Sequence, residues 1–498
     1  MDTGIFHNIH QFESFKSGLK RSILMVLVVI FNYCVLFGQT YTLEQVIRFA
    51  RENSTEALRI KTSKENKYWQ WKTYKAEYKP QLILKANLPS YQNKNTAVTQ
   101  DDGSIEFRNI NQNEVNAELS LEQNIGLTGG KIFISSDFNR LDDFKQNTGN
   151  YSGSPFYIGI EQPLFVFNDL KWMNRIEPLK YEESHKEFIE ENEKIAYNTT
   201  VKYFNLLISQ INYQVAYTNK ANADTIYNVG IEKYALGKIS KNELLQLKYG
   251  VISAQKSIAT ARLSIKTTLL ELCSYTGLNE IDTIVLALPD SIFRFYIDDS
   301  LAISKAMKNS LRSVEFKREV LEARRDAEQA RRESGLNANL SISYGKTNAA
   351  SDIYGMYENP QNLQTLDIEL SIPIFDWGRT KAKRKTAEGD LELVKYTVQQ
   401  DKINFRQEVI SEIENFRMLQ EFVEYTAEAD CTATSRFEIA RLRYMASDIS
   451  LTEYNIALEE KDQAKWDYIE ALRDYWLAYH SIRILTLYDF NNHQQIIY

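Results

Sequence analysis

The stretch KYALGKISKNE at residues 233–243 decides the fold, because the chain repeats it as RYMASDISLTE at residues 443–453. The two copies lie 443 − 233 = 210 residues apart. A second pair, QPLF at 162–165 and IPIF at 372–375, has the same offset. An internal repeat of this size indicates one duplicated structure rather than several unrelated domains.

The offset between the copies is larger near their beginnings. Residues 43–53 and then 55–78 read as a short helix followed by a longer one, and 301–309 and 311–334 read as their counterparts. Ile47 then matches Ile303, an offset of 303 − 47 = 256. The difference of 256 − 210 = 46 residues predicts an extra hairpin in the strand region of the first copy.

Alternation of apolar and polar residues predicts the strands. In the first copy it occurs from Leu82, over 116–123, over 131–138 and over 156–164; in the second it occurs over 337–344 and 366–374. The polar stretches 93–113, 142–154 and 346–361 are predicted to be exposed loops. Such strands of about 10 residues fit an outer-membrane barrel, although an ordinary soluble sheet has the same period.

The region from 169 to 235 predicts one very long helix, roughly 100 Å at about 1.5 Å per residue, with Pro178 near its start. Apolar or small residues recur there and in later segments in steps of three and four. They are Val201, Phe204, Ile208, Ile211 and Val215; Leu247, Val251, Ala254, Ile258, Ala261 and Ile265; and Ala457, Ala464, Tyr468, Ala471, Tyr475 and Ala478. This is coiled-coil spacing, and the small seam residues predict helices packed closely side by side.

The first 38 residues are predicted to be a secretory signal peptide. Lys16, Lys20 and Arg21 precede an apolar run over 22–36, and Gly38 supplies a small residue near a cleavage site. A retained membrane anchor is the alternative, but the run is shorter than the ~20 residues of a spanning helix. The cysteines left after cleavage, Cys273 and Cys431, form no disulfide framework.

The composition argues against nucleic-acid binding and against catalysis. The net charge is −7, with no basic block. The arginines 324, 325, 331 and 332 alternate with acids and are interpreted as a solvated helix face. The five histidines have no metal-ligand spacing, and no Ser/His/Asp or Cys/His set is present. We therefore expect no enzyme activity, no cofactor and no metal.

Three features together resemble the TolC-type outer-membrane efflux protein family over nearly the whole mature chain. They are the opening helix 43–53 with its copy, the segments 162–165 and 372–379, and the two Tyr-x-x-Gly/Ser-x-Ile-Ser turns. The resemblance implies an α+β membrane protein: a trimeric outer-membrane β-barrel continued by a long periplasmic α-helical barrel. It also implies a periplasmic adaptor (membrane fusion) protein and an inner-membrane pump as partners.

The strand count gives a separate reason for assembly. Four to six strands are too few to close a barrel, since such barrels start near eight. Only a closed barrel satisfies every strand edge in hydrocarbon, so copies must pool their strands in the outer-membrane lipid. Three chains would give 12 strands, or 18 if the extra hairpin joins the wall.

The resemblance assigns the two turns to the periplasmic tip that docks on the adaptor. The residues concerned are Tyr234, Gly237, Ile239 and Ser240, and in the second copy Tyr444, Ser447, Ile449 and Ser450. Pro163, Phe165, Pro373, Phe375 and Gly378 are assigned to the strand-to-helix junctions.

Glu243 and Glu453 each follow a serine by three residues, which is the spacing of a helix capping box. The alternative is that these acids line the channel entrance. The family resemblance places an entrance acid at Glu453.

The predicted organisation is a signal peptide (1–38), a first repeat (39–290), a second repeat (291–486) and a C-terminal tail (487–498). The predicted function is an outer-membrane exit duct, extending into the periplasm, of a tripartite efflux or type I secretion system. It would move substrates without covalent chemistry. A periplasmic coiled-coil scaffold without a pore and a surface adhesin are the alternatives.

Overall fold

The computed structural model describes residues 40–278, 284–289 and 292–498, so the predicted signal peptide lies outside the described part. The chain divides into two compact units. The helical unit contains the described residues up to Lys61, together with Ile189–Lys305 and Val409–Tyr498. The sheet unit contains Thr62–Phe188 and Ala306–Glu408. Within the described residues, no helix is both long and apolar enough to cross a membrane.

The helices occur in pairs of equal length, one from each half of the chain. The pairs are α2 (Leu43–Asn53) with α6 (Asp299–Asn309), α3 (Thr55–Glu77) with α7 (Leu311–Glu333), α4 (Asp169–Ala235) with α8 (Arg379–Met445), and α5 (Lys241–Thr276) with α9 (Leu451–Thr486). The first two pairs keep the offset of 256 residues, as 299 − 43 shows, and the last two keep 210, as 379 − 169 shows. The predicted duplication and the predicted long helix 169–235 are confirmed.

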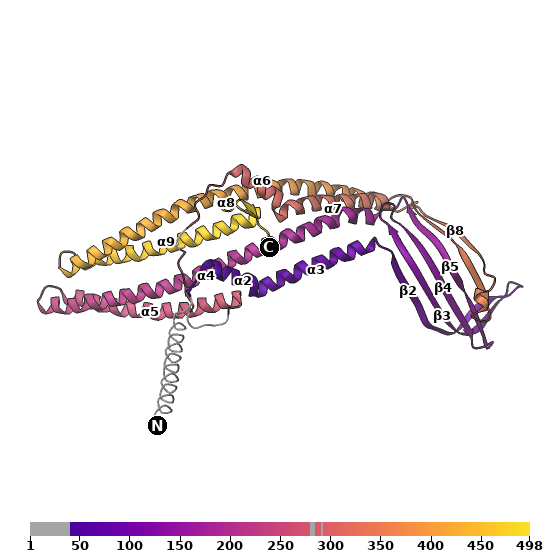
Figure 1. The fold of residues 1–498 in the computed structure, drawn as a ribbon, viewed down its shortest axis with the longest axis horizontal. Helices are drawn as coiled ribbons and strands as arrows, with labels where there is room; N and C mark the ends of the chain where they lie inside the picture. Colours follow the sequence, from indigo (N-terminus) through magenta and orange to yellow (C-terminus); the bar gives the residue numbers. More distant parts are fainter. Residues whose placement is uncertain (1–39, 279–283, 290–291) are drawn as a thin grey trace, which may run out of the picture. The chain divides into compact units, whose positions relative to one another are not determined.

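The sheet unit is built around one antiparallel sheet of six strands (Figure 1). The strands are β2 (Gln81–Thr99), β3 (Ile105–Ile125), β4 (Gly130–Asp143), β5 (Thr148–Leu164), β7 (Asn337–Ala350) and β8 (Gln361–Ser371). Their spatial order is β2-β3-β4-β5-β7-β8, so β2 and β8 are the edges. The first copy contributes four of these strands, β2 to β5, and the second copy contributes two, β7 and β8. The two additional strands are the extra hairpin that the change of offset predicts.

The predicted loops are largely wrong, because the strands continue into them. β2 and β3 remain paired out to Thr99↔Ile105, and only residues 100–104 turn the chain. β4 and β5 likewise pair out to Asp143↔Thr148. Cross-strand backbone bonds satisfy a hairpin whatever the polarity of its side chains, so polar composition did not mark the ends of the strands.

The other two predicted boundaries also shift. β7 extends to Ala350, and a single 3-10 turn, Gly355–Tyr357, follows it before β8. β8 ends at Ser371, earlier than the predicted 374. Pro373 has no N–H for the ladder, which explains the early end.

The two faces of the sheet have opposite chemistry. Cross-strand pairs such as Leu84↔Leu119, Ile134↔Ile158 and Ile342↔Leu366 place apolar side chains on one common face. This face is exposed within the chain and carries Leu82, Leu84, Leu119, Leu121, Ile132, Ile134, Ile158, Ile342, Tyr344, Leu366, Ile368 and Leu370. The opposite face carries Ser341 on β7 and charged residues on the other five strands: Lys85, Glu118, Glu122, Lys131, Glu161, Asp367 and Glu369.

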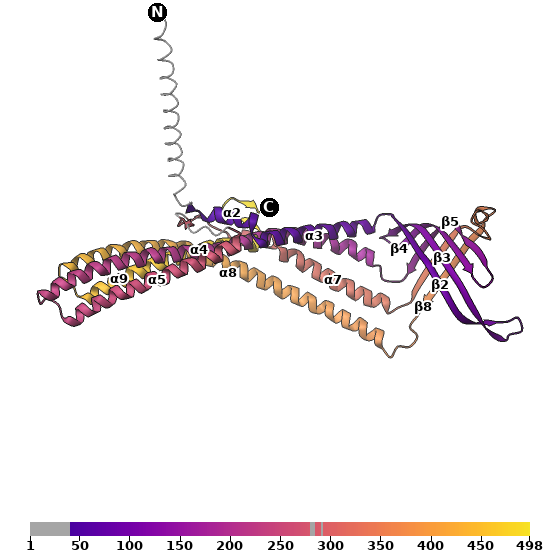
Figure 2. The same ribbon diagram turned by 90° about the horizontal axis from the view of Figure 1, so that it is seen from below.

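The helical unit consists mainly of two helical hairpins. α5 runs beside α4, and α9 runs beside α8, in both views (Figures 1 and 2). Large side chains fill the unit, including Tyr203, Phe204, Phe416 and Tyr475, each fully buried. On the predicted seams, Ala457, Ala471 and Ala478 are also buried. Two small sheets complete the unit: β1 (Thr40–Tyr41) with β6 (Val285–Leu286), and β9 (Tyr488–Asp489) with β10 (Gln494–Gln495).

Candidate functional site

The turns α4–α5 and α8–α9 have the same backbone hydrogen bonds. Lys238 N–H donates to Lys233 C=O over 2.8 Å, and Asp448 N–H donates to Arg443 C=O over 2.9 Å. One residue earlier, Gly237 and Ser447 donate to the carbonyls of the two tyrosines, Tyr234 and Tyr444. This is the pattern of a helix that ends in a left-handed residue and then reverses.

The second turn takes this conformation without a glycine. Gly237 has φ +67°, and Ser447 has almost the same value, +66°. A side chain in the left-handed region costs roughly 1 kcal/mol or more, because its Cβ crowds the following carbonyl. A Cβ added to Gly237 would meet no atom within 4 Å. The cost of a side chain at position 237 therefore comes from backbone strain rather than from a clash.

The two helices that follow the turns begin differently. The side-chain oxygens of Ser240 and Ser450 each accept a backbone N–H three residues on, over 3.1 and 3.2 Å. Glu453 completes the predicted capping box, because its carboxylate accepts from Ser450 N–H over 2.9 Å. The hydrogen bonds with Ser450 lower the pKa of Glu453.

Glu243 does not complete the predicted box, and for this residue the prediction is wrong. Its carboxylate instead accepts from the hydroxyl of Tyr444 in the other hairpin, over 3.3 Å. Burial, with Glu243 nearby, raises the pKa of Tyr444 to about 12, so this hydroxyl stays a donor. The hydroxyl of Tyr444 thus binds the carboxylate that the sequence assigns to the cap of α5.

Lys233 and Tyr444 link the two turns directly. The Lys233 ammonium donates to the backbone carbonyl of Tyr444 over 2.7 Å and lies 4.6 Å from the centre of its ring. Tyr444 is 2% exposed, whereas its counterpart Tyr234 is 42% exposed. Behind the turns a buried cluster holds the hairpins together: Ile226, Leu247, Phe437, Tyr444, Leu451, Tyr454 and Ala457, with Ile239 and Ile449 packed against it.

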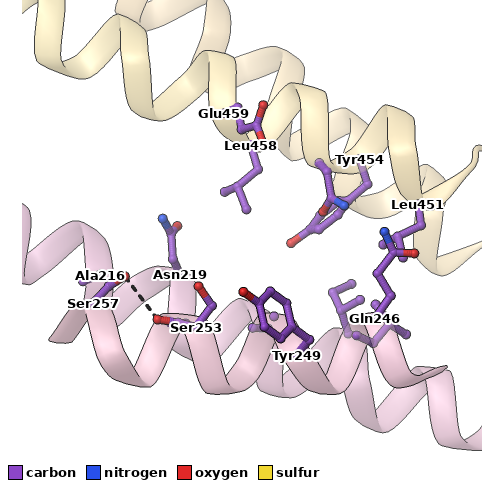
Figure 3. Close-up of a pocket in the computed structure, with 16 residues that line it drawn as sticks. Ala216, Asn219, Gln246, Tyr249, Ser253, Ser257, Leu451, Tyr454, Leu458 and Glu459 are labelled. Atoms are coloured by element: carbon purple, nitrogen blue, oxygen red, sulfur yellow. Dashed lines mark hydrogen bonds between the residues drawn. The ribbon is translucent and has the colours of Figure 1, made fainter. Parts of the chain in front are cut away.

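A cavity of about 380 Å³ lies between α9 and the α4–α5 hairpin, next to this cluster (Figure 3). Asn219 and Tyr249 face Tyr454 and Leu458 across it. Small residues such as Gly250 and Ser253 line one wall, and Glu459 is the single ionisable acid or base in the lining besides the tyrosines. Such a lining offers no acid–base pair, so the cavity does not resemble a catalytic cleft.

The strand-to-helix junctions also use left-handed residues. Phe165 has φ +66° just after β5, while Trp377 and Gly378 have +57° and +84° just before α8. Phe375 and Trp377 are 73% and 90% exposed. Pro163 lies inside β5, paired with Asn339, and Pro373 follows the end of β8.

Comparison with known proteins connects this geometry to a family. The model of the family described as outer membrane efflux protein matches residues 124–278 and 302–486. These segments span 155 + 185 = 340 of the 498 residues, and each segment lies within one half of the duplication.

The chain belongs to the outer membrane efflux protein family. It is therefore an outer-membrane efflux channel, and its family is one of channels rather than enzymes.

Solved structures of three outer-membrane proteins share the fold of this channel. The CmeC outer membrane channel of Campylobacter jejuni is 15% identical, with a TM-score of 0.65 over 92% of this chain and 87% of that one. VceC from Vibrio cholerae is 12% identical, with a TM-score of 0.60 over 89% and 95%. The open-state MtrE channel of Neisseria gonorrhoeae is 14% identical, with a TM-score of 0.54 over 89% and 88%. Among curated proteins, no sequence matches the channel.

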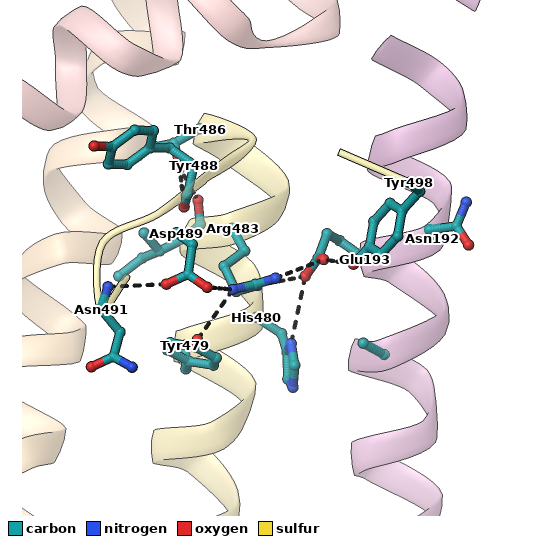
Figure 4. A network of polar contacts seen from close by, with 12 residues as sticks. Asn192, Glu193, Tyr479, His480, Arg483, Thr486, Tyr488, Asp489, Asn491 and Tyr498 are labelled. Atoms are coloured by element: carbon teal, nitrogen blue, oxygen red, sulfur yellow. Dashed lines mark hydrogen bonds and ion pairs between the residues drawn. The ribbon is translucent and has the colours of Figure 1, made fainter. Parts of the chain in front are cut away.

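The helical unit of the efflux channel also contains a buried ionic cluster that the sequence analysis missed (Figure 4). Glu193 of α4 is fully buried and receives two bonds from the Arg483 guanidinium, 2.8 and 3.0 Å long. Arg51 of α2 donates to the same carboxylate over 3.0 Å, and the hydroxyl of Tyr498 donates to it as well. Arg483 also binds Asp489 over 2.5 Å.

The cluster therefore ties α2, α4, α9 and the segment after α9 together around one carboxylate. Burial by itself would raise the pKa of Glu193, but the guanidinium groups of Arg483 and Arg51 outweigh it and hold that pKa well below its usual range. Removing one partner of such a buried pair leaves an uncompensated charge and costs about 3–5 kcal/mol.

His480 lies inside this cluster without a hydrogen bond. Its Nδ1 is 3.7 Å from the Glu193 carboxylate, within ion-pair range but beyond hydrogen-bond range, and neither ring nitrogen has a hydrogen-bond partner in the described residues. Burial lowers the pKa of His480, and the nearby guanidinium groups act in the same direction against the attraction of Glu193. The imidazole is therefore neutral in the folded channel at neutral pH.

The sequence held little signal for this cluster, because none of its members repeats. The positions equivalent to Glu193 and Arg483 are Ile403 and Cys273, from 193 + 210 and 483 − 210. The only hint was Arg483, a charged residue in the mainly apolar end of α9. The pairing depends on tertiary contacts between segments about 290 residues apart.

We predict that acid weakens the helical unit through His480. Because its folded pKa lies below the unfolded value of 6.5, the unfolded chain binds the proton first. Stability is then fully present above pH 6.5 and falls by up to about 1.4 kcal/mol per pH unit below it. Thermal unfolding of the purified channel, followed at 222 nm from pH 8 to pH 5, measures this slope.

The variant His480→Leu should lose the slope between pH 7.5 and 5.5, whatever its absolute stability. The exposed residue His185 provides the matched control, and His185→Gln should keep it. An unchanged slope in His480→Leu would contradict the assignment.

Proposed function

We propose that the channel works as a homotrimeric exit duct, in which three copies close one barrel in the outer membrane. The observation that carries this proposal is the six-stranded sheet with its exposed apolar face and two edge strands, β2 and β8. Hydrocarbon supplies no partner for the backbone groups of an edge. Single-chain barrels start near eight strands, so six cannot close alone.

Three copies of six strands give 3 × 6 = 18 strands, and the number three comes from the family resemblance. The exposed apolar face disfavours the first alternative, a periplasmic scaffold without a pore, because such a scaffold stays in water. An adhesin would need long display segments, but the turns at 100–104 and 144–147 are short.

The purified channel should therefore have the mass of a trimer in detergent. Size-exclusion chromatography with light scattering measures the protein mass apart from the bound detergent. Circular dichroism of the same fraction reports whether the strands are formed. A monodisperse monomer with full strand content would contradict the proposal.

The charged face of the sheet is proposed to line the duct. Each chain contributes Glu118, Glu122, Glu161, Asp367 and Glu369 against Lys85 and Lys131. Lys131 bridges Glu122 and Glu161, at 3.3 Å from each, so these charges are held in fixed positions. A polar wall moves cargo without covalent chemistry, and the energy must come from the inner-membrane pump.

The two turns are proposed to form the periplasmic tip that meets the adaptor. Tyr234 and Leu236 are 42% and 71% exposed at the first turn, which leaves apolar surface for a partner. Ser447 and Ser450 are exposed at the second, while Tyr444 supports that turn from inside. Gly237 and Ser240 shape the first turn, through its left-handed residue and its helix cap.

We predict that Gly237→Val abolishes export while trimer formation and membrane insertion remain. A β-branched residue at φ +67° costs about 1–2 kcal/mol and would force the turn into another shape. Ser447→Gly is the matched control: it relieves strain at φ +66°, should stabilise the channel by about 1 kcal/mol, and should keep export. Wild-type export by Gly237→Val, measured as drug susceptibility or secreted substrate, would refute the tip assignment.

Glu453 is proposed to act mainly as the cap of α9, and its role at the entrance is a separate question. Glutamine can accept the same bond from Ser450 N–H but carries no charge. We therefore expect Glu453→Gln to change cation preference in planar bilayers very little. Glu243→Gln removes a carboxylate that makes no capping bond and serves as the matched control.

A clear loss of cation selectivity in Glu453→Gln alone would contradict the capping assignment. It would place the three acids of a trimer near the channel axis, where like charges in a narrow ring attract cations.

A further inference from the structure

A basic cavity of about 590 Å³ lies in the sheet unit where β5 passes into α4. Two separate segments supply its cations: α4 contributes Lys171 and Arg175, and α7 contributes Arg324, Arg331 and Arg332. Glu328 and Glu388 are the acids in the lining, so the cavity has a net charge of 5 − 2 = +3. Arg324, Arg331 and Arg332 of α7 are exposed, as the sequence predicts, and they also line this cavity.

Three of the five cations remain available for a ligand. Glu328 is occupied by Arg331 and Arg332, at 2.9 and 2.8 Å, and Glu388 is bound by Lys385 at 2.7 Å. Lys171, Arg175 and Arg324 are exposed, and no described carboxylate lies within ion-pair distance of their side chains. Convergent cations without acidic partners are suited to a phosphate group.

Aromatic and apolar side chains border the same cavity. Phe165 is 61% exposed and Val166 is 38% exposed, and both follow directly after β5. Trp172 also lines the cavity, with the Arg175 guanidinium 5.5 Å from the centre of its ring. Aromatic rings next to basic residues, at the end of a strand with an apolar outer face, are typical of the level of lipid headgroups.

We propose that this cavity binds the phosphate of an anionic glycerophospholipid, in the leaflet at the helix end of the membrane strands. Lys171, Arg175 and Arg324 bind the headgroup phosphate, while Phe165 and Trp172 lie against the glycerol and upper acyl chains. A charged helix face in water would explain the arginines of α7. It would not explain why cations from α4 and exposed aromatics converge on the same cavity.

Native mass spectrometry of the full-length channel, with dioleoylphosphatidylglycerol and dioleoylphosphatidylcholine as competing probes, tests the proposal. Each basic residue near a lipid surface contributes about 1 kcal/mol, which is a factor of five to six in affinity. The double variant Arg175→Gln/Arg324→Gln should therefore bind phosphatidylglycerol about 30-fold more weakly. The matched control Lys256→Gln/Arg262→Gln removes two exposed cations of α5 and should bind like the wild type.

A second arm separates lipid from soluble phosphate. Inorganic phosphate at millimolar concentration should not displace phosphatidylglycerol, because it lacks the acyl chains that the aromatic side chains contact. Equal binding by the Arg175→Gln/Arg324→Gln variant and the wild type would overturn the proposal, as would equal affinity for the two lipids. Displacement by inorganic phosphate would assign the cavity to a soluble anion and overturn the lipid assignment. A mass spectrum in which the channel retains an acidic protein in place of lipid would assign the cavity to a partner and overturn it as well.

Discussion

Strands β2 and β8 each have one row of backbone N–H and C=O groups that no other described strand pairs. In hydrocarbon each such group costs several kcal/mol, a far larger penalty than any surface contact of this chain can offset. The amphipathic sheet can therefore enter a membrane only when its edges meet edges of other copies. In the proposed duct, the two helix turns and the charged face of the sheet can serve export only once this wall is closed.

The regular parts of the fold could be predicted from the sequence because they are local and duplicated. The five helices with predicted bounds begin and end within two residues of the observed positions, since periodicity and capping depend on short segments. The parts of β2 and β3 next to their connecting turn were missed because pairing between the two strands, rather than composition, keeps these parts extended. The cluster around Glu193 was missed because its partners come from distant segments.

Duplication produced equal helices but unequal contacts. α4 and α8 both have 67 residues, yet the buried carboxylate Glu193 corresponds to Ile403 in the other copy. The capping serines correspond, yet only Glu453 closes its box, while Glu243 reaches Tyr444 in the other hairpin. The two turns therefore have similar backbones but different side-chain contacts: Tyr444 is buried at the second turn, and Tyr234 is exposed at the first.

Cross-linking of the proposed seam tests the central claim most directly. Leu84 lies three residues from the beginning of β2, and Ile368 lies three residues from the end of β8, so antiparallel pairing of neighbouring copies brings them to one level. Leu84→Cys combined in turn with cysteine at 366, 368 or 370, in a Cys431→Ser background, samples the possible registers. The account predicts that oxidation of at least one pair gives a covalent trimer on a denaturing gel. Monomer bands for every pair, in channel shown to be inserted in the outer membrane, would contradict it.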